Sequence, residues 1–129
     1  MELAKKQFMS LESKLNNHEV GLKAEDICAK YLQSKGYKIL DKRFKCKAGE
    51  IDIIAYKKNL LAFVEVKRRK NALLDDPIGK TGKRRIANAA LQYIYANEQY
   101  SESEIRFDFI FVDSDFSLTH TEAAWIMEE

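Results

Sequence analysis

The stretch that decides the fold is GEIDIIA at Gly49–Ala55, followed after a short polar turn by LAFVEVK at Leu61–Lys67. Both runs have the composition of strands in a sheet core, yet they carry Asp52, Glu65 and Lys67 where a core would favour valine. Burying a charge is costly unless the charge is paired or binds a metal ion. We therefore expect these three side chains to stand at the rim of a site for a hard divalent cation, an arrangement suited to phosphodiester hydrolysis.

The register of this hairpin depends on its turn. If Lys58 and Asn59 form a two-residue turn, Asp52 falls directly opposite Glu65, with Cβ atoms about 4.5–5.5 Å apart on one face of the sheet. Two acids placed there would repel each other without a cation, and strand alternation adds Lys67 to the face of Glu65. The dipeptide Lys-Asn lacks the glycine favoured in two-residue turns. A loop one residue longer would put the two acids on opposite faces.

Composition predicts one folded domain inside the cell. The chain has 129 residues, of which 46% are hydrophobic and 11% aromatic, enough for a core. No apolar run approaches the roughly 18 residues that span a membrane, and the N-terminus lacks the apolar centre of a signal peptide. Cys28 and Cys46 have no metal-type spacing, and His18 and His120 are too scattered for a zinc site. We expect reduced thiols and a cytoplasmic location.

The formal net charge of +2 hides a strong asymmetry. Basic residues flank the hairpin on both sides, whereas the last thirty residues are acidic. A polyanion such as nucleic acid is the natural partner of such a surface, and the alternative is a set of ordinary solvated side chains. The candidate nucleic-acid-binding residues are Lys45, Lys47, Arg68, Arg69, Lys70, Lys80, Lys83, Arg84 and Arg85.

Hydrophobic periodicity divides the chain into an N-terminal arm at residues 1–17, which could be helical, and a domain at residues 18–129. The domain begins with a helix over about Glu19–Lys35, which Gly36 ends. Glu25 lies at the edge of the apolar stripe of this helix, so it is either exposed or leans over the sheet towards the acidic site.

The rest of the pattern predicts an αβββαβ order in a mixed sheet flanked by helices. A strand–helix–strand step favours a right-handed crossover between parallel strands, here through the second helix. The loop before that helix carries two glycines, and a loop of this kind often carries binding function. The predicted segments are strands at Tyr37–Cys46, Ile51–Tyr56 and Leu60–Lys67, a loop at Asn71–Gly82, a helix at Lys83–Asn97, a strand at Ile105–Val112 and a short edge strand at Ser117–Glu122.

Three side chains, those of Arg106, Asp108 and Trp125, have a mainly structural interpretation. Arg106 and Asp108 alternate along a strand and are expected to form an ion pair. Trp125 caps the core or serves a dimer contact. Lys83 lies on the inner face of the second helix, where solvation of the helix start and phosphate binding are equally good interpretations. Arg84 and Arg85 are expected to point away from that face.

An early helix with Glu25, then Gly-Glu-Ile-Asp at 49–52 and Phe-Val-Glu-Val-Lys at 63–67, resembles the PD-(D/E)XK nuclease superfamily. More closely, the chain resembles the small bacterial YraN-like family, described as related to Holliday-junction resolvases. The likeness runs from about Glu19 to Ala123 and implies a restriction-endonuclease-like α/β core. The proline that names the superfamily is absent, since Ile51 precedes Asp52.

The resemblance implies a role for each matching residue. Asp52 and Glu65 match metal ligands, and the backbone carbonyl of Val66 would complete the shell. Lys67 matches the lysine that orients or activates the attacking water, and Glu25 matches the helix acid that assists the metal or a second ion. Mg²⁺, which binds through one or two carboxylates and keeps several waters, is the expected cofactor, with Mn²⁺ as a substitute.

These features predict a metal-dependent endonuclease that cuts DNA by attack of water, without a covalent enzyme intermediate. Branched or junction DNA is a candidate substrate, and a homodimer would suit it because two strands are cut symmetrically. The alternatives are a nucleic-acid-binding module that keeps the fold with little catalysis, and a protein-interaction module with a basic face. A structural salt bridge from Lys67 would account for one acid but not for Asp52, Glu65 and Glu25 together.

Overall fold

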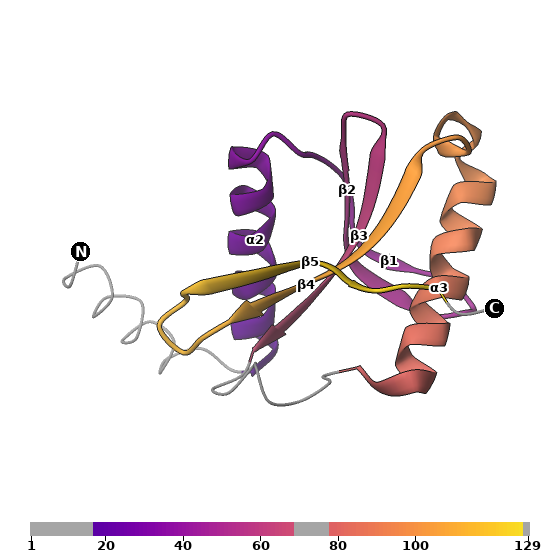
Figure 1. The fold of residues 1–129 in the computed structure, drawn as a ribbon. Coiled ribbons are helices and arrows are strands. Elements are labelled where there is room, and N and C mark those ends of the chain that lie inside the picture. The colour runs from indigo at the N-terminus through magenta and orange to yellow at the C-terminus, as the bar shows by residue number, and fades with distance from the viewer. Residues whose placement is uncertain (1–16, 69–77, 128–129) are drawn as a thin grey trace.

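A computed structural model describes residues 17–68 and 78–127 (Figure 1). Residues 1–16 of the predicted arm, together with Arg69 and Lys70, lie outside the described residues. None of the helices in the described parts is long and apolar enough to cross a membrane. The elements are α2 (Asn17–Ser34), β1 (Lys38–Lys45), β2 (Glu50–Lys57), β3 (Leu60–Arg68), α3 (Gly79–Ala96), the 3₁₀-helix η1 (Glu98–Tyr100), β4 (Glu104–Val112) and β5 (Leu118–Trp125).

The five strands form one mixed sheet in the order β1-β2-β3-β4-β5. Neighbouring strands are antiparallel except β3 and β4, which are parallel and joined through α3, as the sequence predicted. The two long helices lie on opposite sides of the sheet (Figure 1). The α/β prediction is therefore confirmed, and the arrangement is consistent with a restriction-endonuclease-like core.

A stripe of small and apolar residues fixes α2 against the sheet. Val20, Ala24, Cys28 and Leu32 recur every four residues, so they share one helix face, and all four are buried. The helix ends where Gly36 adopts a φ of 95°, a left-handed conformation that glycine takes readily. Burial of this stripe holds the helix against β1, β2 and β3.

The hairpin turn has two residues, as the register argument required. Lys58 and Asn59 have φ values of 47° and 64°, and Lys57 pairs with Leu60 across the turn. Positive φ at both central residues is the geometry whose twist matches the flanking strands. The hypothesis of a loop one residue longer is therefore wrong, even though the turn lacks glycine.

Helix α3 begins earlier than the sequence predicted. Residues Gly79–Gly82 were assigned to a loop because of their two glycines, but the helix starts at Gly79. A Cβ atom at Gly82 would lie 2.6 Å from Cγ2 of Ile78, so the absence of a side chain lets the first turn pack closely. Tertiary packing thus outweighs the low helix propensity of glycine here.

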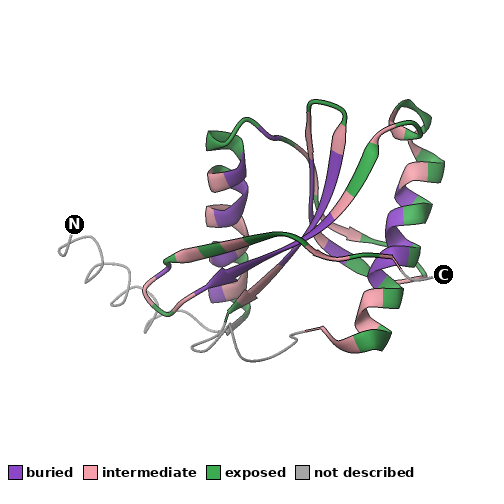
Figure 2. Ribbon diagram, viewed as in Figure 1, coloured by how far each residue is buried: buried purple, intermediate pink, exposed green. Residues whose placement is uncertain are grey.

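Two apolar cores fill the space on either side of the sheet. In Figure 2 the buried residues lie on the strands and on the sheet-facing sides of both helices. The α2-side core includes Ile53 and Val64, whereas the α3-side core includes Ile51 and Phe63. Trp125 stacks on Phe107 with ring centroids 4.1 Å apart at the edge of the α3-side core, so it covers that core.

Candidate functional site

The two hairpin acids lie where the backbone pairing of β2 with β3 gives way to side-chain bonds. The pairing runs from Lys57 and Leu60 to Ile53 and Val64, so Asp52 and Glu65 occupy the next step. There the backbone N–H of Asp52 donates to Oε1 of Glu65 at 3.3 Å. The backbone N–H of Val66 donates to Oδ2 of Asp52 at 2.8 Å. These reciprocal bonds hold both carboxylates between the two strands.

Strand alternation breaks at Asp52. In a regular strand Ile51 and Ile53 would point to the same face of the sheet. Instead Ile51 packs in the α3-side core and Ile53 in the α2-side core. The side-chain bonds of Asp52 replace regular pairing at this point, so the strand turns over there.

Glu65 is the more deeply buried acid of the pair, with 7% of its surface exposed, whereas Asp52 is half-buried. Burial, and after it the negative charge of Asp52, raises the pKa of Glu65 to about 9. Two adjacent carboxyl groups repel each other when both are ionised, and a cation between their oxygens offsets this repulsion. The residues present therefore fit Mg²⁺, which needs only one or two carboxylates from the protein.

Glu25 is half-buried, with 19% of its side chain exposed, and its Oε2 lies 3.9 Å from Nε of Arg43 on β1, so it faces the sheet rather than the solvent. Burial, followed by the charge of Asp52, raises the pKa of Glu25. The same two carboxylates contribute, after burial, to raising the pKa of Cys28 to about 12. Within residues 17–68 and 78–127, no group of three or more His, Cys, Asp and Glu side chains is arranged to hold a metal ion. Glu25 thus stands beside the Asp52–Glu65 pair rather than within it.

Lys67 is half-buried, and its positive charge acts to lower the pKa of Glu65. In the described parts of the chain Lys67 forms no ion pair with Asp52 or Glu65, so a salt bridge is not what holds the two acids. The backbone N–H of Val66 is used in the site, while a metal-binding role for its carbonyl stays a prediction.

The predicted basic residues lie at the ends of three elements near this part of the fold. Lys45 ends β1, Lys47 follows it in the turn and Arg68 ends β3; all three are exposed. On α3, Lys80 and Arg84 are exposed and Lys83 is half-buried. In Figure 1 the end of β3 and the start of α3 both lie towards the lower side of the molecule.

Arg85 links the second helix to the β1–β2 turn. It is exposed, away from the inner face of the helix as predicted, and its Nε donates to the carbonyl of Ala48 at 3.4 Å. A Cβ atom at Gly49 would lie 3.2 Å from the carbonyl oxygen of Arg85, so the β1–β2 turn packs directly on α3. This contact brings the basic residues of the turn next to those of the helix.

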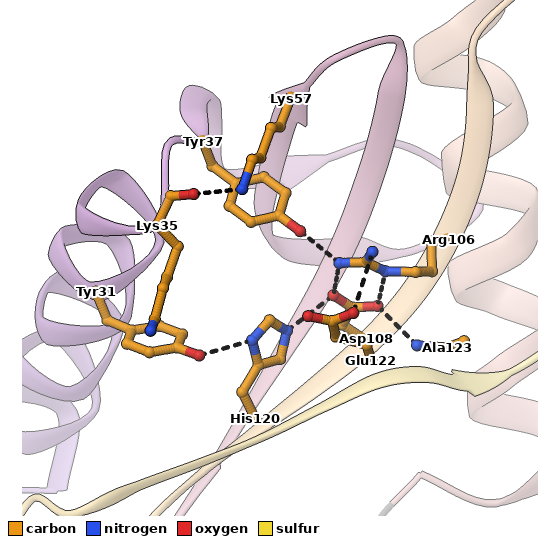
Figure 3. A network of polar contacts seen from close by, with 9 residues as sticks. All are labelled: Tyr31, Lys35, Tyr37, Lys57, Arg106, Asp108, His120, Glu122 and Ala123. Atoms are coloured by element: carbon orange, nitrogen blue, oxygen red, sulfur yellow. Dashed lines mark hydrogen bonds and ion pairs between the residues drawn. The ribbon is translucent and has the colours of Figure 1, made fainter.

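A second polar cluster ties β4 to its neighbours (Figure 3). The buried carboxylate of Asp108 accepts hydrogen bonds from Nε and Nη2 of Arg106, both at 2.8 Å, which confirms the predicted ion pair. Nε2 of His120 lies 2.9 Å from Oδ2 of Asp108, and the backbone N–H of Ala123 donates to Oδ1 at 3.1 Å.

This cluster also reaches α2 through Tyr31 and the α2–β1 connection through Tyr37. The hydroxyl of Tyr31 lies 3.0 Å from Nδ1 of His120, and Nη2 of Arg106 donates to the hydroxyl of Tyr37 at 2.6 Å. Burial acts to raise the pKa of Asp108, but the hydrogen bonds from His120 and Arg106 outweigh it, and the pKa is lowered. Sequence reasoning considered His120 only as a zinc ligand. The signal it missed is that a buried aspartate in an apolar strand needs more than one partner.

Comparison with known proteins places the chain among relatives. A model of the uncharacterised protein family UPF0102 matches residues 24–112. The chain belongs to this family. A UPF0102 protein of Rhodopseudomonas palustris (strain HaA2) is 38% identical over 126 residues, covering 95% of this chain and 97% of that protein. A UPF0102 protein of Caldanaerobacter subterraneus subsp. tengcongensis is 44% identical over 100 residues, covering 75% and 81%.

UPF0102, the YraN family, is related to the PD-(D/E)XK nuclease superfamily, so the resemblance seen in the motifs is confirmed. The matched region contains the hairpin acids, Lys67, Glu25 and the Arg106–Asp108 pair. The names of the relatives state no activity.

Proposed function

We propose that this protein is a metal-dependent endonuclease that hydrolyses DNA phosphodiester bonds, with branched or junction DNA among its substrates. One observation carries the proposal: Asp52 and Glu65 lie side by side at the end of the hairpin, with Glu65 buried and each carboxylate held by a backbone N–H. Holding two acids together in this way has no structural benefit, since it raises the free energy of the metal-free protein.

The site residues have separate tasks. Asp52 and Glu65 would hold Mg²⁺, or Mn²⁺ in its place, and the N–H of Val66 keeps Asp52 pointed at Glu65. When bound, the ion polarises the phosphoryl oxygen, lowers the pKa of water and holds the reactants in line. Lys67 orients the attacking water and offsets the negative charge that develops on the phosphate. Glu25, on α2, is the neighbouring acid that assists in holding the metal ion.

The basic residues around the site support nucleic acid as the substrate. Exposed cations lie at the end of β1 (Lys45), in the β1–β2 turn (Lys47), at the end of β3 (Arg68) and on α3 (Lys80 and Arg84). Such residues contact phosphates, and binding then weakens steeply with salt concentration. The free thiols of Cys28 and Cys46 support a reducing, cytoplasmic location.

The proposal is tested by incubating labelled linear, single-stranded and four-way-junction DNA with the protein in Mg²⁺, Mn²⁺ or EDTA. Asp52→Asn and Lys67→Ala should abolish cleavage while leaving the protein folded. Lys38→Ala is the matched control, because Lys38 is an exposed cation that pairs with Tyr56 towards the turn end of the sheet. DNA binding by well-folded wild type without cleavage in either metal would reject catalysis and leave a nucleic-acid-binding module.

A further inference from the structure

Arg43 has an unusual backbone conformation in the strand next to the site. Its φ is 57°, in the left-handed region that residues with a Cβ atom rarely adopt. Lys42 pairs with Ile53 and Phe44 pairs with Ile51, so Arg43 stands across from Asp52. The irregular residue of β1 therefore faces the point at which alternation breaks in β2. Backbone strain at such a position suggests a functional requirement for the direction of the side chain.

The guanidinium of Arg43 lies between two carboxylates. Its Nε is 3.9 Å from Oε2 of Glu25 and 3.9 Å from Oε1 of Glu50. This Nε is buried and has no hydrogen-bond partner within the described parts of the chain. Both oxygens are beyond hydrogen-bonding distance, so Arg43 acts on them through its charge rather than through a directed bond.

The charges of the two acids beside Arg43 act on each other, and Glu25 also lies within range of the charge of Asp52 in the metal-binding pair. Burial, and after it the charges of Asp52 and Glu50, act to raise the pKa of Glu25, and the charges of Arg43 and Lys42 act to lower it. Glu25 and Glu50 thus flank Arg43, which itself stands across from Asp52 of the metal-binding pair. Nucleases with two metal ions hold them about 3.5–4 Å apart between such groups. Here a fixed cation already stands between Glu25 and Glu50.

We propose that Arg43 takes the place of a second metal ion, so that the site binds one divalent cation, at Asp52 and Glu65. Arg43 is a positioning residue in this scheme, since it holds Glu25 beside the ion. A second cation between Glu25 and Glu50 would be repelled by the guanidinium at close range. The inference rests on the proposed metal site but adds its stoichiometry, which the nuclease proposal leaves open.

The test is a titration of the full chain with Mn²⁺, in which free ion is counted by electron paramagnetic resonance and heat by calorimetry. Arg43→Asn removes the charge, and asparagine adopts the left-handed backbone more readily than arginine, so this variant should fold. Lys38→Asn is the matched control, because Lys38 is an exposed cation of the same strand that pairs with Tyr56, towards the turn end of the sheet. Arg43→Lys keeps a positive charge.

Wild type, Lys38→Asn and Arg43→Lys should each bind one Mn²⁺ per chain, and Arg43→Asn should bind two. An equal number of ions in wild type and Arg43→Asn would overturn the inference while leaving the nuclease proposal standing. Two ions in wild type would overturn it as well. Wild type that binds no Mn²⁺ would reject the metal site and, with it, both proposals.

Discussion

Replacing Asp108 by asparagine should destabilise the fold by about 3 kcal/mol at pH 7. The side chain is fully buried and receives four hydrogen bonds, two of them from Arg106, whose own side chain is 17% exposed. Asparagine keeps the shape and one acceptor oxygen, but its amide would face the donors of Arg106 and His120. Breaking a buried pair costs about 3–5 kcal/mol. We take the lower end because Arg106 can still reach Glu122, 3.5 Å away and exposed.

Urea unfolding followed by circular dichroism measures this loss directly, with Asp113→Asn as the control because that aspartate is half-exposed. The pKa of Asp108 is lowered in the folded protein, so its contribution is fully present above the unfolded value near 3.9 and is lost as the pH falls through the folded pKa. The difference between wild type and Asp108→Asn should therefore shrink as the pH falls below about 3.9.

A loss smaller than about 1 kcal/mol at pH 7 would refute this reasoning, because it would mean that water replaces the network at little cost. A loss that grows on acidification would also refute it, since the sign of the pKa shift of Asp108 would then be wrong.

Three further predictions concern the site. Glu65→Gln should raise the melting temperature in EDTA, because it removes a buried acid next to Asp52, and should abolish the stabilisation by Mn²⁺ seen in wild type. Cys28, buried and with its pKa raised to about 12, should react with a thiol reagent only at the rate of unfolding in a Cys46→Ser background; fast labelling would contradict its burial. Lys47→Ala should reduce the salt slope of DNA binding by about 0.9, and an unchanged slope would exclude a phosphate contact there.

Much of this fold could be predicted from local pattern alone. The stripe from Val20 to Leu32 defines α2, and Gly36 ends it, because both depend on spacing within one helix. The two-residue turn at Lys58–Asn59 followed from placing two acids opposite each other, although no turn glycine marked it. Where packing competes with propensity the prediction was wrong, as at the start of α3, where Ile78 packs on Gly82.

The sequence by itself determined which residues are the candidates for a site, namely the hairpin acids and the lysine two positions after Glu65, because charges in apolar strands are informative wherever the strands lie. Only the tertiary structure decided what surrounds them. Arg43 faces Asp52 and stands between Glu25 and Glu50 because β1 pairs with β2 and α2 packs across them. Such contacts join positions far apart in the chain, and they involve a break in strand alternation, so no periodicity in the sequence encodes them.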